Sequence, residues 1–184
     1  MLGEPGAGKS SLFKGESTNT DNGHYETARD FIDLDRMEEW KGKTLFIDGL
    51  DETRAGNSAD RTPLGAIRGK LDKLGCKRFR ISCREADWLS SLDNKDLSKV
   101  SPDPEIKELH LDPLTSDDIK QILSNDKRVD DADAFIEKAE QFSLTGLLDN
   151  PQTLDIAPSI CSANVGSFQG CLFEWLLTSR TFAV

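Results

Sequence analysis

The chain has 184 residues, with 33 acidic and 23 basic side chains and a formal net charge of −10 at pH 7. This length allows one hydrophobic core and a small appended subdomain, and the excess of acid argues against a general surface for nucleic acids or anionic membranes. No segment is apolar for long enough to span a membrane and no signal peptide opens the chain, so we expect a soluble, cytoplasmic protein.

Two compositional features have simple structural interpretations. The four cysteines show no C-x-x-C spacing and no nearby histidine pair, which favours reduced thiols, mostly in the core, over a zinc site or disulfides. The basic segment from Arg68 to Arg84 is more typical of a solvated helix face that leads into a strand than of a binding patch. The cysteines are Cys76, Cys83, Cys161 and Cys171.

The chain begins with a glycine-rich loop. Gly3, Gly8, Lys9 and Ser10 fit the pattern G-x-x-x-x-G-K-[ST], in which backbone N–H groups and a helix N-terminus surround phosphates. In this pattern the lysine reaches the β- and γ-phosphates and the serine hydroxyl can hold Mg²⁺. A dinucleotide-binding loop is a weaker interpretation, because no third glycine follows at the required spacing. The predicted nucleotide-binding residues are Gly3, Glu4, Pro5, Gly6, Ala7, Gly8, Lys9, Ser10 and Ser11.

The segments around this loop are weakly marked. A phosphate-binding loop follows a buried strand of about five or six residues, but only Met1 and Leu2 precede it here. We therefore expect a first strand that is nearly absent, in a chain that is an excerpt of a longer protein. After brief helix signals, residues 16–23 read as a polar loop, residues 31–34 as an edge strand and residues 35–40 as a short helix or turn.

The strongest strand signal is the short apolar run that ends in the acidic sequence of residues 48–52. Such a run is typical of a buried parallel strand that brings a carboxylate to its C-terminal end. Ligands of open α/β sheets bind at that end, where Asp48 is placed to accept Mg²⁺ or its water, and either Asp51 or Glu52 to polarise an attacking water. The sequence does not separate these last two acids, because their directions depend on the turn that follows the strand.

A helix is predicted at residues 63–74 and a further strand at residues 78–83. Arg84 follows that strand, so its guanidinium is placed either to approach a γ-phosphate or to form a surface ion pair with Glu85 or Asp87. The residues alone favour neither alternative.

The last strand is predicted at residues 108–111, with Leu109 and Leu111 directed inward, and the pattern beyond it is helical. Strands first and helices afterwards predict an α/β nucleotide-binding core at residues 1–112 and a helical subdomain at residues 113–184.

Three helices are predicted in the subdomain. A capping box of Thr115 and Asp118 starts the first, residues 131–142 form the second, and a turn at residues 149–151 precedes the third. Near the C-terminus, an apolar stripe at helical spacing needs a partner surface. The residues expected to share buried faces are Ile119, Ile122 and Leu123, then Phe135, Ile136, Ala139 and Phe142, then Leu154 and Ile156, and in the stripe Phe168, Cys171, Leu172, Trp175 and Leu176.

Several of these segments form an ordered set. They are Gly3–Ser10, Phe46–Glu52, Arg80–Arg84, Leu111–Thr115 and Asp149–Pro151. The set resembles the signal-transduction NTPases with numerous domains, the STAND class, and within it the NACHT-type ATPases of large bacterial proteins, including antiphage sensors. The resemblance covers nearly the whole chain, and the D-G-L-D-E sequence is its most specific element.

The resemblance implies a P-loop NTPase fold: an α/β three-layer sandwich with a mostly parallel sheet in strand order 5-1-4-3-2, followed by a small α-helical subdomain. It implies ATP binding and slow hydrolysis to ADP and phosphate, which switch self-association or the further domains of a longer parent protein. The winged helix, effector and sensing repeats of such proteins are not in this sequence, as expected of an excerpt truncated at both ends.

The resemblance also assigns the binding residues, with ATP and Mg²⁺ as ligands. Lys9 and Ser10 match the phosphate-loop lysine and the Mg²⁺ ligand, and Asp48 matches the acid on the Mg²⁺ side. Pro151 matches the proline of the helical subdomain that packs near the adenine. ATP is expected rather than GTP, because the sequence has no N/TKxD-like guanine reader.

In the same way, Asp51 or Glu52 matches the hydrolytic acid, and Arg84 matches the sensor arginine. Other functions compatible with these motifs are a non-catalytic nucleotide-binding or interaction scaffold and an inactive truncated fragment. A small-molecule kinase would share the phosphate loop but explains the paired acids and the helical tail poorly.

Overall fold

The computed structural model describes residues 1–54, 63–75, 78–103 and 105–163, with side chains described up to residue 159. The chain divides into two compact units, Met1–Leu111 and Asp112–Val184. None of the described helices is long and apolar enough to cross a membrane.

The first unit is built on a parallel three-stranded sheet in the order β1-β2-β3. The central strand β2 (Thr44–Asp48) is buried along its whole length and pairs with β1 (Gly23–Thr27) on one side and β3 (Phe79–Ile81) on the other. The prediction of a buried parallel strand that ends at Asp48 is thus confirmed. The coarse α/β class is confirmed as well.

One residue extends this pairing beyond β3. Leu2 forms parallel bridges with both Cys83 and His110. Its N–H donates to the carbonyl of Leu109, and its own carbonyl accepts from the N–H of Leu111. The expected first strand is therefore a single residue that lies between two neighbouring backbone segments.

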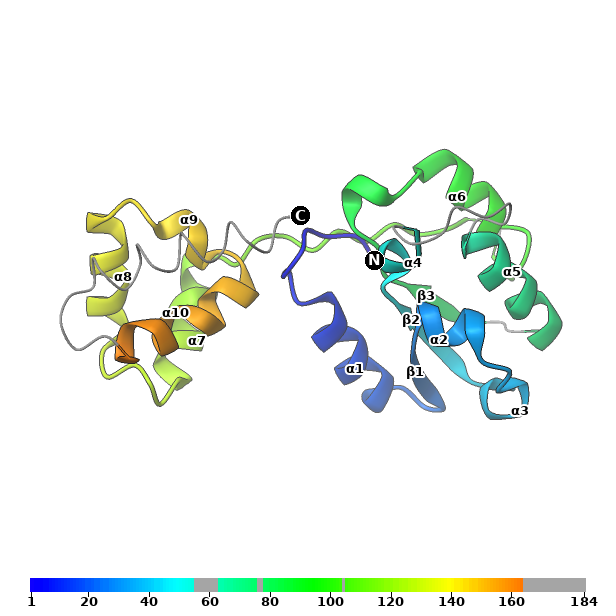
Figure 1. The fold of residues 1–184 in the computed structure, drawn as a ribbon, viewed down its shortest axis with the longest axis horizontal. Helices are drawn as coiled ribbons and strands as arrows, with labels where there is room; N and C mark the ends of the chain where they lie inside the picture. Colours follow the sequence, from blue (N-terminus) through cyan, green and yellow to red (C-terminus); the bar gives the residue numbers. More distant parts are fainter. Residues whose placement is uncertain (55–62, 76–77, 104, 164–184) are drawn as a thin grey trace. The chain divides into compact units, whose positions relative to one another are not determined.

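Helices cover both faces of the sheet (Figure 1). On one face, Phe13 of α1 meets Phe46 edge-on, with ring centroids 5.6 Å apart. On the other, Leu45 and Ile47 join the core formed with α2 and α5. The helices of this unit are α1 (Lys9–Asn19), α2 (Ala28–Asp33), α3 (Met37–Trp40), α4 (Leu50–Arg54), α5 (Pro63–Leu74) and α6 (Ser90–Leu97), with a 3₁₀ turn at Glu85–Asp87.

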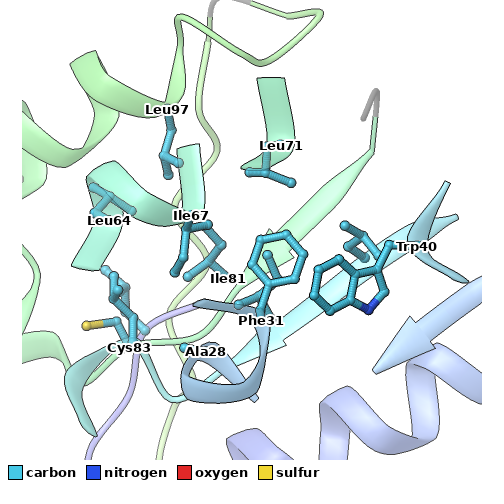
Figure 2. Close-up of a cluster of buried hydrophobic side chains, with 13 residues drawn as sticks. Ala28, Phe31, Trp40, Leu64, Ile67, Leu71, Ile81, Cys83 and Leu97 are labelled. Carbon is cyan, nitrogen blue, oxygen red and sulfur yellow. The ribbon is translucent and has the colours of Figure 1, made fainter. Parts of the chain in front are cut away.

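The main core lies between the sheet and the helices α2, α3, α5 and α6 (Figure 2). The rings of Phe31 and Trp40 pack at a tilted angle with a centroid separation of 4.5 Å, and both side chains are fully buried. Cys83 is a free, fully buried thiol in this core, which confirms the prediction for that cysteine, and burial raises its pKa to about 11. The side chains of Cys76, Cys161 and Cys171 lie outside the described residues.

Between α1 and β2, the predicted short helix or turn at residues 35–40 is confirmed by α3, but the two predictions before it were wrong. Half of residues 16–23 form the end of α1, an edge strand lies at Gly23–Thr27, and residues 31–34 belong to α2 and its C-terminal cap. The strand has no apolar run to reveal it, since its buried Glu26 is instead satisfied by polar neighbours, the side chains of Arg36 and Trp40 at 3.4 Å.

The predicted last strand was also wrong in extent. Among the described residues of segment 108–111, only His110 forms a bridge, and Leu109 is 65% exposed rather than directed inward. Glu108 holds this segment instead by accepting hydrogen bonds from Trp88, Ser90 and Asn94, which lower the pKa of its carboxyl group.

The second unit consists of α7 (Ser116–Asn125), α8 (Ala132–Gln141), α9 (Thr145–Leu148) and α10 (Pro151–Ala163). The predicted capping box at the start of α7 is present in full, and α8 matches the second predicted helix. Ile122, Phe142 and Ile156 are exposed rather than buried. The core is formed by Ile119, Leu123, Phe135, Ala139, Leu148 and Leu154. The predicted C-terminal stripe lies outside the described residues.

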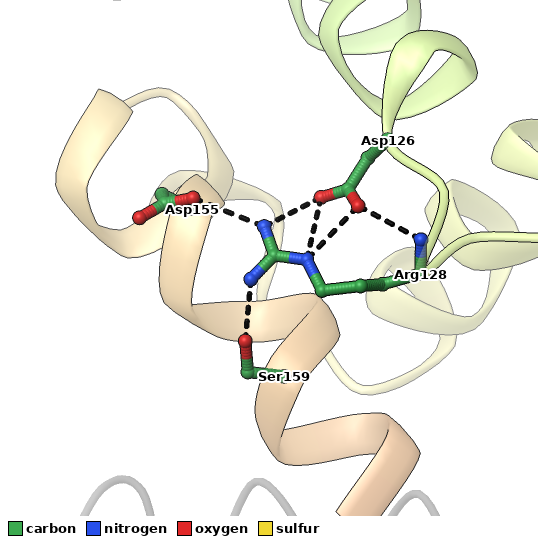
Figure 3. Close-up of polar contacts among 4 residues, drawn as sticks. All are labelled: Asp126, Arg128, Asp155 and Ser159. Carbon is green, nitrogen blue, oxygen red and sulfur yellow. Dashed lines mark hydrogen bonds and ion pairs between the residues drawn. The ribbon is translucent and has the colours of Figure 1, made fainter.

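Arg128 joins α10 to the connection between α7 and α8 (Figure 3). Its guanidinium donates to Asp126 on its own loop, to Asp155 at 3.0 Å and to Ser159 at 2.5 Å. These hydrogen bonds raise the pKa of Arg128 above its already high ordinary value. These contacts therefore connect the loop between α7 and α8 to α10.

Candidate functional site

The glycine-rich loop turns directly from Leu2 into α1. Gly6 and Gly8 have φ angles of 78° and 87°, in the left-handed region that favours glycine, and Gly8 is the N-cap residue of α1. The Lys9 ammonium donates to the carbonyls of Gly3 at 2.7 Å and Glu4 at 2.9 Å. The carbonyl groups of the loop thus bind the side chain of the lysine that follows the loop.

The start of α1 suits an anion. The first-turn N–H groups of a helix have no acceptor within the helix, and no described side chain caps those of α1. The helix dipole adds a partial positive charge at the same point, and the Lys9 ammonium adds a full one. Ser10 and Ser11 stand exposed in this first turn. Backbone donors, an ammonium and two hydroxyls are therefore available to a phosphate group.

Asp48 ends the central strand and is only 7% exposed. Each of its carboxylate oxygens accepts a hydrogen bond from a hydroxyl: Oδ2 from Tyr25 on β1 at 2.9 Å, and Oδ1 from Ser82, which directly follows β3. Ser82 in turn accepts the Gly49 N–H at 2.8 Å. Burial and the hydrogen bond to Asp48 raise the pKa of Tyr25 well above its usual range, so the phenol remains a donor.

Asp51 and Glu52 occupy different environments, although both lie in the first turn of α4. Asp51 is 8% exposed and binds Arg84 twice, through Nε at 2.8 Å and through the backbone N–H at 3.1 Å. Glu52 is exposed and folds back over Gly49, whose φ is +77°. A Cβ at position 49 would lie only 3.3 Å from the Glu52 carboxyl carbon, so glycine permits this close approach.

Arg84 pairs with neither of the acids that the sequence suggested as its surface partners. Its observed partner is Asp51, whereas Glu85 contacts His110 at 3.0 Å. The Arg84 side chain is half exposed. It is therefore oriented by a buried acid while part of the guanidinium stays open to solvent.

These groups lie at one edge of the sheet. Because β2, β3 and the Leu2 bridges are all parallel, the residues that follow each of them emerge at the carboxyl end of the strands. The structure thus brings the phosphate loop, Asp48, the acids of α4 and Arg84 to one side of the first unit. The sequence analysis assigned no role to Tyr25 or Ser82. Tyr25 required the missed strand β1, and Ser82 lies inside the predicted strand 78–83 without a motif to mark it.

Pro151 belongs to the second unit, where it is the first residue of α10. The Oδ1 atom of Asn150 accepts the N–H of Gln152 at 3.0 Å, so Asn150 caps this helix and proline occupies a position that needs no N–H.

The oxygen ligands of the site suit a hard cation. Carboxylate and hydroxyl oxygens are the ligands that Mg²⁺ takes in proteins, and Mg²⁺ commonly binds through one or two protein groups together with substrate phosphates. Over the described ranges, no group of three or more His, Cys, Asp or Glu side chains is arranged to hold a metal ion.

A cavity of the first unit lies toward the opposite end of the strands. Its volume is about 610 Å³, and its lining includes the starts of β2 and β3 and the segment 105–109. The Met1 amine lies here and donates to the Ile81 carbonyl at 2.6 Å, and burial lowers the pKa of this amine to about 6. The cavity is mostly apolar, with Phe13, Phe79 and Leu109 in its wall. It is not part of the polar site.

Comparisons with family models, with curated proteins and with solved structures returned no match for this chain.

Proposed function

We propose that this chain is an ATP-binding regulatory NTPase module of the STAND class, similar to NACHT ATPases. It binds ATP with Mg²⁺, hydrolyses ATP slowly to ADP and phosphate, and acts as a nucleotide-dependent switch in signalling or antiphage defence. The observation that carries this proposal is the meeting, at one sheet edge, of the Lys9 loop with Asp48, Glu52 and Arg84.

The order of backbone segments supports the proposal. Counted along the chain, Leu2 comes first, β1 second, β2 third, β3 with Cys83 fourth and His110 fifth. Across the sheet they lie in the order His110, Leu2, β3, β2, β1, which is 5-1-4-3-2. This is the order that the resemblance to P-loop NTPases implies.

The residues of the loop have distinct binding roles. The first-turn N–H groups of α1 and the Lys9 ammonium receive the phosphates, and the two carbonyls that now hold Lys9 are exchanged for phosphate oxygens. Ser10 and Asp48 hold Mg²⁺, which, when bound, neutralises charge on the phosphates. Asp48 does so from a buried position fixed by two hydroxyls.

The two acids of α4 divide their roles. Both oxygens of Asp51 accept hydrogen bonds or ion pairs from Arg84, which leaves this acid poorly placed to take a proton from water. Glu52 is exposed beside the end of β2 and is the better candidate for polarising the attacking water. Asp51 then positions Arg84 toward the γ-phosphate.

A second candidate, a non-catalytic nucleotide-binding scaffold, is favoured by one observation. Each carboxylate oxygen of Asp48 and of Asp51 already accepts a hydrogen bond or ion pair from the protein. A site that is satisfied in this way can bind nucleotide without turning it over. Bound ATP that is never converted to ADP would favour this scaffold.

Equilibrium binding of a fluorescent ATP analogue, with and without Mg²⁺, tests the proposal. Lys9→Ala should weaken binding by about 100-fold, since a charge-assisted hydrogen bond is worth about 1.5–3 kcal/mol and the phosphates accept more than one. Lys95→Ala, which removes an exposed lysine of α6, is the matched control and should bind like the parent chain. Equal affinity of the Lys9→Ala variant and the parent chain would refute the proposal.

A further inference from the structure

We propose that Tyr25 is a positioning residue of the magnesium site, which fixes the Asp48 carboxylate from β1 and links it to the helix that carries Lys9. The proposal rests on the proposed function, since it concerns Mg²⁺ bound together with ATP. Neither the motif pattern nor the resemblance assigns a role to this tyrosine.

The first step concerns the needs of a buried carboxylate. Asp48 is almost fully buried, and a buried charge is costly unless donors satisfy it. Two hydroxyls do so, one from each side of β2: Tyr25 on β1 and Ser82 directly after β3. The carboxylate is thus held between the two neighbours of its strand and cannot rotate without losing both donors.

These donors orient Asp48 without blocking it. An ionised carboxylate has about four lone-pair sites, two on each oxygen. Tyr25 uses one site on Oδ2 and Ser82 uses one on Oδ1, so each oxygen keeps a site for a cation or its water. Outer partners of this kind hold metal ligands in place, and their loss typically lowers metal affinity by about 10- to 100-fold.

Tyr25 also contacts the other half of the site. The Lys14 ammonium of α1 lies over the Tyr25 ring, 5.4 Å from its centroid. The same side chain therefore touches the helix that begins at the phosphate loop and donates to the acid at the end of β2. The Ser82 hydroxyl instead accepts the N–H of Gly49, the residue that follows Asp48. Tyr25 joins the phosphate-binding and metal-binding parts.

The Tyr25→Phe variant isolates the hydroxyl, because it keeps the ring and its contact with Lys14. ATP affinity is measured by fluorescence over a Mg²⁺ series and again in EDTA, and thermal unfolding is followed without nucleotide. We expect the Mg²⁺-dependent gain in ATP affinity to fall about tenfold, whereas affinity in EDTA stays close to that of the parent chain. The unfolding temperature should fall modestly, because the buried Asp48 carboxylate loses one of its two donors.

A double-mutant cycle separates positioning from a general structural effect. Asp48→Asn should remove the Mg²⁺-dependent gain, and adding Tyr25→Phe to it should have no further effect. Ser82→Ala provides a second test of the same carboxylate and should also lower the gain. An unchanged gain in Tyr25→Phe, or additive losses in the double variant, would overturn the positioning role. If the parent chain binds no ATP under either condition, the proposed function fails as well, so the two failures are distinguishable.

Discussion

The two ends of the same sheet differ sharply. At the carboxyl end, polar groups from four segments meet in short hydrogen bonds, and the buried acids Asp48 and Asp51 each have their partners. At the amino end lies a mostly apolar cavity of about 610 Å³, bordered by the free amine of Met1. The carboxyl end is thus rich in polar contacts, whereas the amino end borders an apolar cavity.

The contrast shows which parts of the site need the central strand. Leu2 alone supplies the bridges that align the phosphate loop with β3 and His110. The acids depend on β2, which is paired on both sides along its length. We therefore expect the acid half of the site to be stable in this chain and the loop half to depend on few hydrogen bonds. The following experiments test this difference, beginning with the largest expected effect.

The carboxyl end should carry the chemistry through Glu52. Replacing Glu52 with Gln should lower ATP turnover by about 10³-fold while ATP binding persists, because loss of a general base costs about 10²–10⁴ in rate. Phosphate release over time, together with ATP binding, measures both quantities. Asp51→Asn is the matched comparison and should act mainly through Arg84, with a smaller loss of turnover. The larger loss in Asp51→Asn would exchange the two roles.

The amino end should accept an added strand. Extending the chain before Met1 by about five or six β-branched and apolar residues should fill the cavity and lengthen the Leu2 pairing. We expect a gain of about 3 kcal/mol in unfolding free energy, since burying one large apolar side chain contributes about 1.5–3 kcal/mol. Denaturant unfolding measures it, with a glycine-serine extension of equal length as the control. Equal stability of both extended chains would show that the cavity takes no strand.

The sequence predicted the parts of the fold in which local pattern and tertiary role agree. The apolar run before Asp48 and the capping box of Thr115 and Asp118 were recognised because each is set by adjacent residues. β1 was missed because an edge strand with a buried, hydrogen-bonded Glu26 has no apolar alternation. Phe31 was assigned to a strand, although it lies in α2, because a single buried aromatic residue shows neither the helical nor the strand spacing of apolar residues.

The candidate site was likewise predicted only in part. The phosphate loop and the acids at residues 48, 51 and 52 were located from motif spacing, but their hydrogen-bond and ion-pair partners were not. The Asp51–Arg84 pair joins residues 33 positions apart, and the contact between Tyr25 and Asp48 joins residues 23 positions apart. Such contacts are fixed by strand register, which no local pattern specifies. They also give Asp51 and Glu52 different surroundings, a difference that the sequence did not reveal.

The smallest expected effect is a pH dependence that comes from the amino end. Burial lowers the pKa of the Met1 amine to about 6, from an ordinary value of 8.0. Between these values the unfolded chain binds more protons than the folded chain, so stability should rise as the pH increases from 6 to 8 and stay level below that window. Two pKa units correspond to less than about 3 kcal/mol, and partial solvation of the amine reduces this to about 2 kcal/mol.

Denaturant unfolding at pH 6, 7 and 8 measures the rise. A chain acetylated at Met1 has no titrating amine but shares every other ionisable group, so the difference between the two forms isolates this contribution. Identical pH profiles for the two forms would mean that the amine is solvated, and that the amino end of the sheet is more open than the hydrogen bond to Ile81 indicates.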